Sequence, residues 1–197
     1  MGKTINIFGD SITWGACDEM GGWANRLKNY WGNSDDYSRV YNLGISSENS
    51  DKLLKRFANE NEARNPDVII IAIGINDSQY IRDKNNPRVS LERFEKNLLE
   101  MIMQARGREI IFIGITDVDE TKVTPIPWDT IKYYDNENIA IYNAKIKEIC
   151  EKNKLPFIEM RDLLKNEDLE DGLHPNSKGH EKMFLRVKDF LETNKII

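Results

Sequence analysis

Three side chains that lie far apart in the sequence have the types that acyl transfer requires. Ser11 follows a short apolar run in a turn flanked by glycine, where its hydroxyl can be presented as a nucleophile. His174 can accept the hydroxyl proton. Asp171, close before it, can accept a hydrogen bond from the other ring nitrogen and hold the required tautomer. The chain has only two histidines, so the choice of base is narrow.

Acyl transfer also needs hydrogen-bond donors for the oxyanion that develops on the carbonyl. The backbone N–H of Ser11 lies in the nucleophile turn itself. Gly44 has no side chain, so its N–H can approach a ligand closely. Asn76 offers a side-chain NH₂ group. We expect these three groups to form an oxyanion hole.

The hydrophobic pattern predicts the elements that position these residues. Short apolar runs predict strands at 4–8, 39–43, 67–73, 109–115 and 156–159. Helical periodicity predicts helices at 23–31, 50–64, 90–106, 135–153 and 176–191. Each candidate site residue then follows a strand, and ligands bind beyond the carboxyl ends of the strands in an open parallel sheet.

Alternating strands and helices predict an α/β fold with helices on both faces of a parallel sheet. The run at 67–73 is continuously apolar and rich in β-branched residues, which is typical of a central strand. Residues 75–89 and 116–134 are expected to be long loops that shape a binding site. No repeat or linker is evident, so we expect one domain over residues 1–197.

Four short segments carry a family resemblance. They are GDSIT at 9–13, NLGIS at 42–46, GIND at 74–77 and DGLHPN at 171–176. In this order and spacing the sequence resembles the SGNH, or GDSL-type, serine esterases and lipases over nearly its whole length.

The resemblance implies a three-layer αβα sandwich around a flavodoxin-like sheet of about five parallel strands. It also implies the triad Ser11, Asp171 and His174, and an oxyanion hole formed by the Ser11 N–H, Gly44 and Asn76. The chain departs from the family pattern at Ile12 and in the segment 46–50, where a GDT-like run is more usual. The second departure concerns the shape of that loop.

Each of these residues also has an ordinary structural explanation when it is taken alone. Ser11 could cap a helix, Gly44 could serve a turn, and Asn76 could form an Asx turn. Their combination favours the catalytic interpretation. Asp10 and Asp77 are expected to be structural and to accept local hydrogen bonds.

The remaining residues that could take part in chemistry are interpreted as structural. His180 lies near the start of the last helix and is expected to pack as a neutral side chain. The two histidines lack a clear third ligand, so no metal site is predicted. Cys17 is expected to be at least partly buried and inert. The acidic run Glu167, Asp168 and Glu170 is expected to be solvated.

The tryptophans and one tyrosine divide into two groups. Trp23, Tyr30 and Trp31 are expected in the core, whereas Trp14 and Trp128 could line the substrate pocket. Trp14 lies close after Ser11, and Trp128 belongs to a proline-rich segment.

Composition excludes several classes of function. With 28 Lys and Arg against 33 Asp and Glu, the net charge of −5 argues against a nucleic-acid binder. Two cysteines exclude a disulfide scaffold and a cysteine-based zinc site. No run approaches the ~20 apolar residues of a membrane span, and no secretory signal is evident. We therefore expect a cytoplasmic protein.

The sequence thus predicts a cofactor-free serine hydrolase that cleaves small carboxylic esters through an acyl-Ser11 intermediate. A carbohydrate acetyl esterase, a lysophospholipase and a thioesterase remain open as variants of the same chemistry. A flavodoxin-like module that binds a nucleotide or flavin is the alternative from another class, but GxGxxG and GxxxxGK motifs are lacking. The pattern leaves the oligomeric state open.

Overall fold

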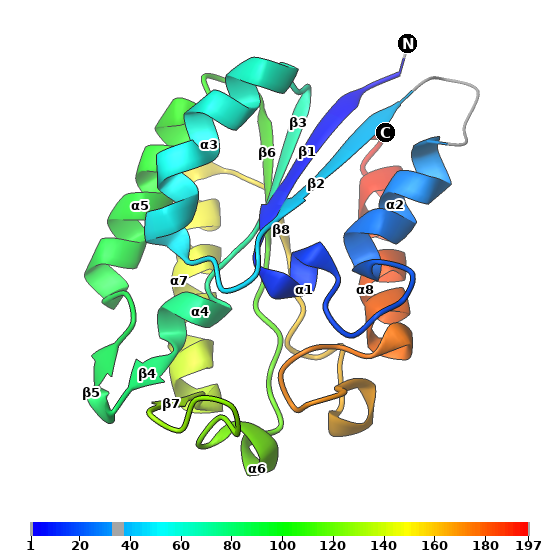
Figure 1. The fold of residues 1–197 in the computed structure, drawn as a ribbon. Helices are drawn as coiled ribbons and strands as arrows, with labels where there is room; N and C mark the ends of the chain where they lie inside the picture. Colours follow the sequence, from blue (N-terminus) through cyan, green and yellow to red (C-terminus); the bar gives the residue numbers. More distant parts are fainter. Residues whose placement is uncertain (1, 33–37, 197) are drawn as a thin grey trace.

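A five-stranded parallel sheet forms the centre of the protein. The computed structural model describes residues 2–32 and 38–196 (Figure 1). The strand order is β2-β1-β3-β6-β8, and all four pairings are parallel. The strands are β1 (Thr4–Gly9), β2 (Arg39–Gly44), β3 (Val68–Ala72), β6 (Glu109–Ile113) and β8 (Phe157–Ile158).

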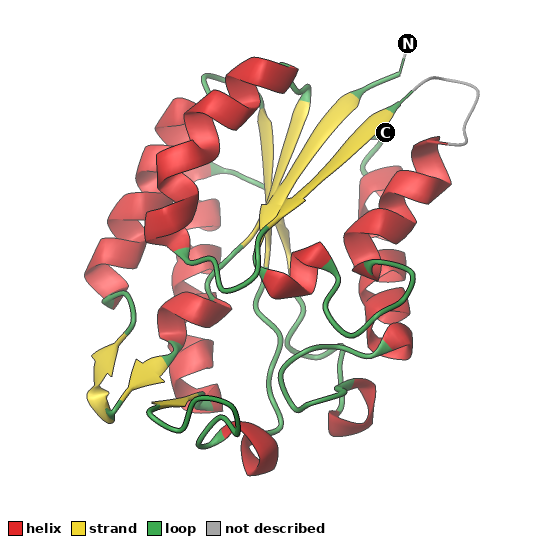
Figure 2. Ribbon diagram, viewed as in Figure 1, coloured by secondary structure: helices red, strands yellow, loops and turns green. Residues whose placement is uncertain are grey.

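Helices cover both faces of this sheet (Figure 2). One layer is formed by α2 (Gly22–Gly32) and α8 (Ser177–Thr193), and the other by α3 (Ser50–Arg64), α5 (Leu91–Gln104) and α7 (Asn136–Asn153). The predicted α/β class, the three layers and the five parallel strands are therefore confirmed.

The local sequence explains these elements. Strand β3 is the central strand of the sheet, and its first four residues are one valine and three isoleucines with buried side chains. Helices α3, α5, α7 and α8 each begin at a side chain that accepts a hydrogen bond from a first-turn N–H group, which is the usual N-cap arrangement. These caps are Asn49, Ser90, Asp135 and Asn176.

The two expected long loops contain regular structure that the pattern did not predict. The first includes α4 (Ile75–Ser78), β4 (Tyr80–Ile81) and β5 (Asp83–Pro87), and the second includes α6 (Glu120–Val123) and β7 (Lys132–Tyr133). Strands β5, β4 and β7 form a small antiparallel sheet beside the main one. Strands of two residues are too short to show a hydrophobic period.

Two further expectations are wrong. Tyr30 is 46% exposed, and its hydroxyl donates to Glu192 at 2.8 Å, whereas Trp23 and Trp31 are buried as expected. Asp168 is not solvated: it is buried at the end of the 3-10 turn η1 (Asn166–Asp168) and forms an ion pair with Lys182 at 2.6 Å.

Among the described residues, no helix combines the length and the apolar character that crossing a membrane would require.

Candidate active site

The candidate nucleophile lies where β1 ends and the short helix α1 (Ser11–Trp14) begins. Asp10 caps this helix by accepting a hydrogen bond from the Ile12 N–H at 2.9 Å. As the first residue of the helix, Ser11 has an N–H without an intrahelical acceptor, so it can donate to a ligand. A Cβ on Gly44 would lie 2.3 Å from the Trp14 nitrogen, so only glycine lets β2 approach α1 this closely.

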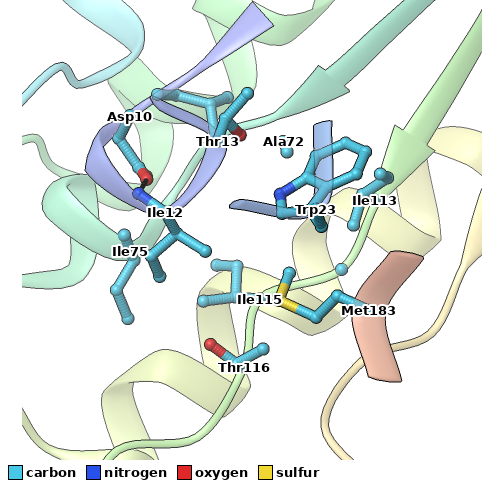
Figure 3. Close-up of a pocket in the computed structure, with 12 residues that line it drawn as sticks. Asp10, Ile12, Thr13, Trp23, Ala72, Ile75, Ile113, Ile115, Thr116 and Met183 are labelled. Atoms are coloured by element: carbon cyan, nitrogen blue, oxygen red, sulfur yellow. Dashed lines mark hydrogen bonds between the residues drawn. The ribbon is translucent and has the colours of Figure 1, made fainter. Parts of the chain in front are cut away.

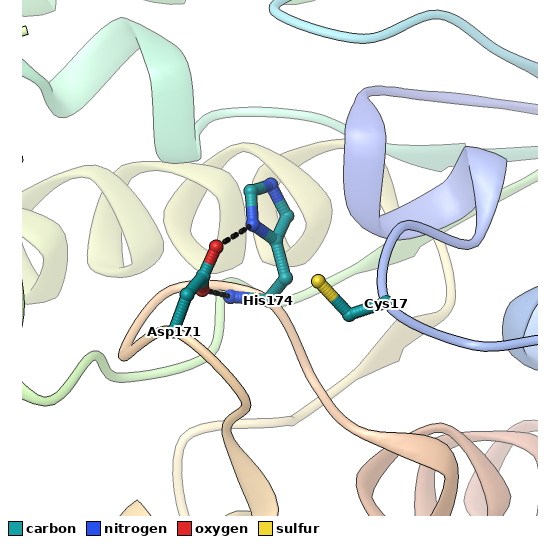
Figure 4. Close-up of side chains that lie close together, drawn as sticks. All are labelled: Cys17, Asp171 and His174. Carbon is teal, nitrogen blue, oxygen red and sulfur yellow. Dashed lines mark hydrogen bonds and ion pairs between the residues drawn. The ribbon is translucent and has the colours of Figure 1, made fainter. Parts of the chain in front are cut away.

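The fold brings Ser11, His174 and Asp171 into one hydrogen-bonded chain. Ser11 Oγ lies 2.9 Å from His174 Nε2. His174 Nδ1 lies 2.7 Å from Asp171 Oδ2, and Figure 4 shows this second contact. The other carboxylate oxygen of Asp171 accepts the backbone N–H groups of Leu173 at 3.0 Å and His174 at 2.8 Å. This arrangement places a proton on Nδ1 and leaves Nε2 free to accept the Ser11 proton.

Asp171 is held in its charged form. Partial burial by itself would raise its pKa, but hydrogen bonds from the His174 ring and backbone, together with the Leu173 N–H, outweigh this effect. They lower the pKa of Asp171 to about 2. The carboxylate therefore stays ionised at every pH at which an enzyme of this kind would work.

A cavity of about 210 Å³ opens beside the Ser11 and His174 side chains. Its lining is largely polar and comes from several elements. The lining residues are Ser11, Ser47, Asn76, Gln79, Arg88, Ile126, Trp128, Asp129, Lys132, Tyr134, Leu173 and His174. We call this space the substrate cavity.

Three groups fix the orientation of the Asn76 amide in the substrate cavity. Its Nδ2 donates to the Glu48 carbonyl at 3.0 Å. Its Oδ1 accepts from the Tyr134 hydroxyl at 3.1 Å and from Arg88 at 3.4 Å. Burial raises the pKa of Tyr134, so its hydroxyl remains a donor. Because Oδ1 is occupied, the second N–H of Nδ2 is the group that Asn76 can offer to an oxyanion.

The structure does not bring the predicted donor Gly44 into the substrate cavity. The Gly44 N–H donates to the side chain of Asn42 at 3.0 Å, and the glycine is used for the approach of β2 to α1. Ser47 lines the cavity instead, with a φ of 60°. Within the described part of the chain its N–H has no acceptor, and its carbonyl accepts from Arg88 at 2.7 Å.

A second, smaller cavity lies under the nucleophile turn (Figure 3). Its volume is about 30 Å³, which is roughly the space of one water molecule. Thr13 Oγ1, Trp23 Nε1 and Thr116 Oγ1 belong to its lining residues and have no protein partner. The Ser11 side chain does not line it, so this cavity is separate from the substrate cavity.

The two aspartates that were expected to be structural are both fully buried. Asp77 accepts hydrogen bonds from the Ser50 N–H at 3.0 and 3.1 Å, which ties α4 to the start of α3. Burial raises the pKa of Asp10 and that of Asp77 to about 7, in spite of the hydrogen bonds that each accepts.

Asp10 therefore leads to a prediction about stability. Between about pH 4 and pH 7 the folded protein keeps a proton that the unfolded chain has released, so the free energy of unfolding should fall as the pH rises. Asp10→Asn keeps the helix cap and should reduce this slope by up to ~1.4 kcal/mol per pH unit. Urea unfolding at several pH values measures it.

The matched control for this experiment is Asp162→Asn. Asp162 is exposed, and its hydrogen bonds with Arg186 lower its pKa, so it does not titrate between pH 5 and 7. Equal slopes in the wild type and Asp10→Asn would show that Asp10 is already ionised across this window.

The other sequence expectations about side chains have clear outcomes. His180 is buried, as predicted: its Nε2 lies 3.0 Å from the Ala16 carbonyl, and its Nδ1 accepts from the Trp23 N–H. Trp128 lines the substrate cavity and stacks on His174, with 6.5 Å between ring centroids. Trp14 is 57% exposed and does not line the cavity. Cys17 is exposed, contrary to expectation.

Sequence reasoning missed Ser47, Arg88 and Tyr134. A non-glycine residue with positive φ is not recognisable from sequence. Arg88 and Tyr134 lie in the segments that were expected to be loops, where no period indicates which side chains face the site.

Comparisons with known proteins identify the family of this chain. The model of the GDSL-like lipase/acylhydrolase family matches residues 7–182. Comparison with curated protein sequences gave no match.

Several solved structures have the same fold. A lipase/acylhydrolase from Enterococcus faecalis is 21% identical with a TM-score of 0.80, and the match covers 98% of this chain and 96% of that one. A catalytic mutant of an acetylxylan esterase from Geobacillus stearothermophilus is 21% identical with a TM-score of 0.75, over 98% and 94% of the two chains. An α/β hydrolase from the metagenome of Lake Arreo, Spain, is 20% identical with a TM-score of 0.76, over the same shares.

At these identities the structural matches show the fold, whereas the sequence match to the family model spans most of the chain. This chain belongs to the GDSL-like lipase/acylhydrolase family and is a hydrolase that acts on ester bonds.

Proposed function

We propose that the protein hydrolyses esters through a covalent acyl-Ser11 intermediate. The hydrogen-bonded chain of Ser11, His174 and Asp171 at the edge of the substrate cavity carries this proposal. Ser11 Oγ attacks the ester carbonyl while His174 Nε2 takes its proton and then delivers it to the leaving alcohol. Water activated by His174 releases the acid and restores Ser11. No step requires a cofactor or a metal.

The oxyanion hole in this mechanism combines two backbone N–H groups and one side chain. We assign it to the Ser11 N–H, the Ser47 N–H and the Nδ2 group of Asn76, so Ser47 takes the place that the sequence indicated for Gly44. Arg88 donates to both the Ser47 carbonyl and Asn76 Oδ1. It is a positioning residue that holds these two donors in register.

The acetylxylan esterase from Geobacillus stearothermophilus supports the triad assignment. Its catalytic mutants replace a serine, an aspartate and a histidine, and the histidine lies three positions after the aspartate. Asp171 and His174 have the same order and spacing in this chain.

The substrate cavity favours a short acyl group on a polar alcohol. Its volume of about 210 Å³ is small for a long acyl chain, since ligand pockets of drug-sized molecules reach roughly 300–1,000 Å³. Its polar lining and the exposed indole of Trp128 suit an acetylated sugar. We therefore propose that the substrates are acetyl esters of carbohydrate-like alcohols. The cytoplasmic location of the protein stays a prediction.

A panel of esters tests this substrate class. We expect kcat/KM for p-nitrophenyl esters to fall at least about tenfold from acetate to octanoate, and acetylated xylose to be hydrolysed. Octanoate as the best substrate would favour a lysophospholipase-like enzyme. A preference for acyl thioesters over matched oxygen esters would favour a thioesterase.

Trp128 and Trp14 provide a matched pair for the same question, because both indoles are about equally exposed at 59% and 57%. Trp128→Ala should raise KM for acetylated xylose, whereas Trp14→Ala should leave it unchanged. Equal effects of the two substitutions would exclude Trp128 as a substrate contact.

Tyr134→Phe should lower kcat about five- to tenfold with little change in KM. The substitution removes the closer of the two donors that occupy Asn76 Oδ1, and such a hydrogen bond is worth about 1 kcal/mol. The amide then turns more easily and presents its oxygen to the oxyanion. Steady-state kinetics on p-nitrophenyl acetate measures this.

Tyr142→Phe is the control. Tyr142 is a buried tyrosine whose hydroxyl donates to the Val89 carbonyl, and it does not line the substrate cavity. Its loss should reduce stability and leave kcat unchanged. If both variants lost activity equally, the effect would come from packing and not from the Asn76 amide.

A further inference from the structure

Cys17 lies close to the side chains of Asp171 and His174. One ligand atom each from Cys17, Asp171 and His174 can be chosen so that all three lie within 4.8 Å of one another. Figure 4 shows Cys17 reaching from the loop after α1 toward the loop that carries Asp171 and His174. A thiolate, an imidazole and a carboxylate are the three ligand types that bind Zn²⁺ in proteins.

The spacing of these atoms is close to that of a zinc site. Zinc bonds of ~2.0–2.3 Å at tetrahedral angles place ligand atoms ~3.3–3.8 Å apart. The Cys17 sulfur would therefore have to approach the other two atoms by at most about 1.5 Å, whereas His174 Nδ1 and Asp171 Oδ2, now 2.7 Å apart, would have to separate by roughly 0.6 Å. Cys17 is exposed on a loop, so its side chain can make that movement.

Cys17 is accessible from outside the substrate cavity. Cys17 lines a surface depression together with the acidic residues Asp18, Glu19 and Glu170 and the cationic residue Lys178. The substrate cavity is lined by His174 and does not include Cys17. The depression at Cys17 and the substrate cavity therefore have different linings, and the depression has more acidic than basic residues.

We propose that Cys17, Asp171 and His174 form an inhibitory Zn²⁺ site. Zn²⁺ bound there would prevent His174 from acting as the base. The site itself is independent of the substrate. Its effect on hydrolysis rests on the proposed role of His174 as the base.

The proton balance explains the inhibition. In the active enzyme Nδ1 of His174 carries the proton and donates to Asp171, while Nε2 accepts from Ser11. Zn²⁺ takes the Nδ1 lone pair, a carboxylate oxygen and the Cys17 sulfur. The thiol proton is released to solvent, and the imidazole proton moves to Nε2. His174 then presents an N–H to Ser11 and cannot accept its proton.

Zinc titrations of the hydrolysis rate test this site. In buffered Zn²⁺ the wild type should lose kcat with KM unchanged, and EDTA should restore the rate. Cys17→Ala should keep the basal rate, because Cys17 has no part in the proposed mechanism. It should need at least about tenfold more Zn²⁺ for half-inhibition. Cys150→Ser, at the buried cysteine of α7, is the matched control and should retain the sensitivity of the wild type.

A binding measurement that needs no activity separates the two proposals. Co²⁺ should give a thiolate-to-metal charge-transfer band in the wild type and in Cys150→Ser. The band should be absent in Cys17→Ala and weakened in His174→Ala. Equal zinc sensitivity in the wild type and Cys17→Ala, or no cobalt–thiolate band, would overturn the metal site and leave the esterase proposal intact. A normal band without any effect of Zn²⁺ on hydrolysis would instead overturn inhibition through His174.

Discussion

Ser11→Ala should reduce ester hydrolysis by about 10⁴- to 10⁶-fold, because the nucleophile of a triad cannot be replaced by its partners. The fold should survive, since alanine fits the first turn of α1 and the cap comes from Asp10. A fluorophosphonate probe should add one adduct to the wild type and none to the variant. Intact-protein mass spectrometry and kinetics with p-nitrophenyl acetate give the two readouts.

The control is Ser46→Ala, which removes an exposed serine near the site that does not line the substrate cavity. This variant should keep its activity and its adduct. Full activity in Ser11→Ala would refute the covalent mechanism.

Asp171→Asn should lower kcat by about 10³- to 10⁴-fold, although it changes few atoms. The asparagine oxygen can still accept the N–H groups of Leu173 and His174, so the loop keeps its shape. Its NH₂ group, however, would face His174 Nδ1 and favour the tautomer with the proton on Nε2. That tautomer cannot take the proton of Ser11.

Asp119→Asn controls for the loss of a buried carboxylate nearby. Asp119 caps α6 and accepts from the Thr121 N–H at 3.2 Å, a role that asparagine can also fill. Its activity should stay within about twofold of the wild type. Unchanged kcat in Asp171→Asn would show that His174 keeps its tautomer without the carboxylate.

The ionised state of Asp171 also bears on acid stability. Because its pKa in the folded protein is lowered to about 2, its stabilising contribution is present above the ordinary aspartate pKa of ~3.9 and is lost as the pH falls toward 2. This change lies below the window in which Asp10 acts, so the two effects can be separated by pH.

The main sheet and the contact between Asp171 and His174 could be predicted because both depend on strong local signals. The apolar run of β3 allows few alternatives, and Asp171 and His174 are close enough in the sequence to meet within one loop. Gly44 shows where such reasoning stops. A glycine after a strand can either donate its N–H to a ligand or let two backbone segments pack closely. Only the position of α1 against β2 distinguishes these two roles.

The expectations for Asp168 and Tyr30 were wrong for a related reason. The burial of Asp168 and the exposure of Tyr30 both depend on partners far along the chain, Lys182 for Asp168 and Glu192 for Tyr30. An acidic run shows its charge in the sequence, but it does not show which carboxylate meets a cation from another helix. The same holds for Cys17, whose neighbours belong to the other end of the chain.

Residues in and near the small sheet of β4, β5 and β7 line the substrate cavity, whereas the triad lies outside that sheet. The two sets of residues can therefore be changed independently. Gln79, Arg88 and Lys132 lie on its strands or next to them in the sequence, and Trp128 and Asp129 lie in the turn before β7. All five line the substrate cavity. Ser11, Asp171 and His174 lie at the rim of the main sheet, outside this unit. A combinatorial library confined to residues 79–88 and 128–132, with Arg88 kept, should therefore yield variants with altered ester preference that still react with fluorophosphonates.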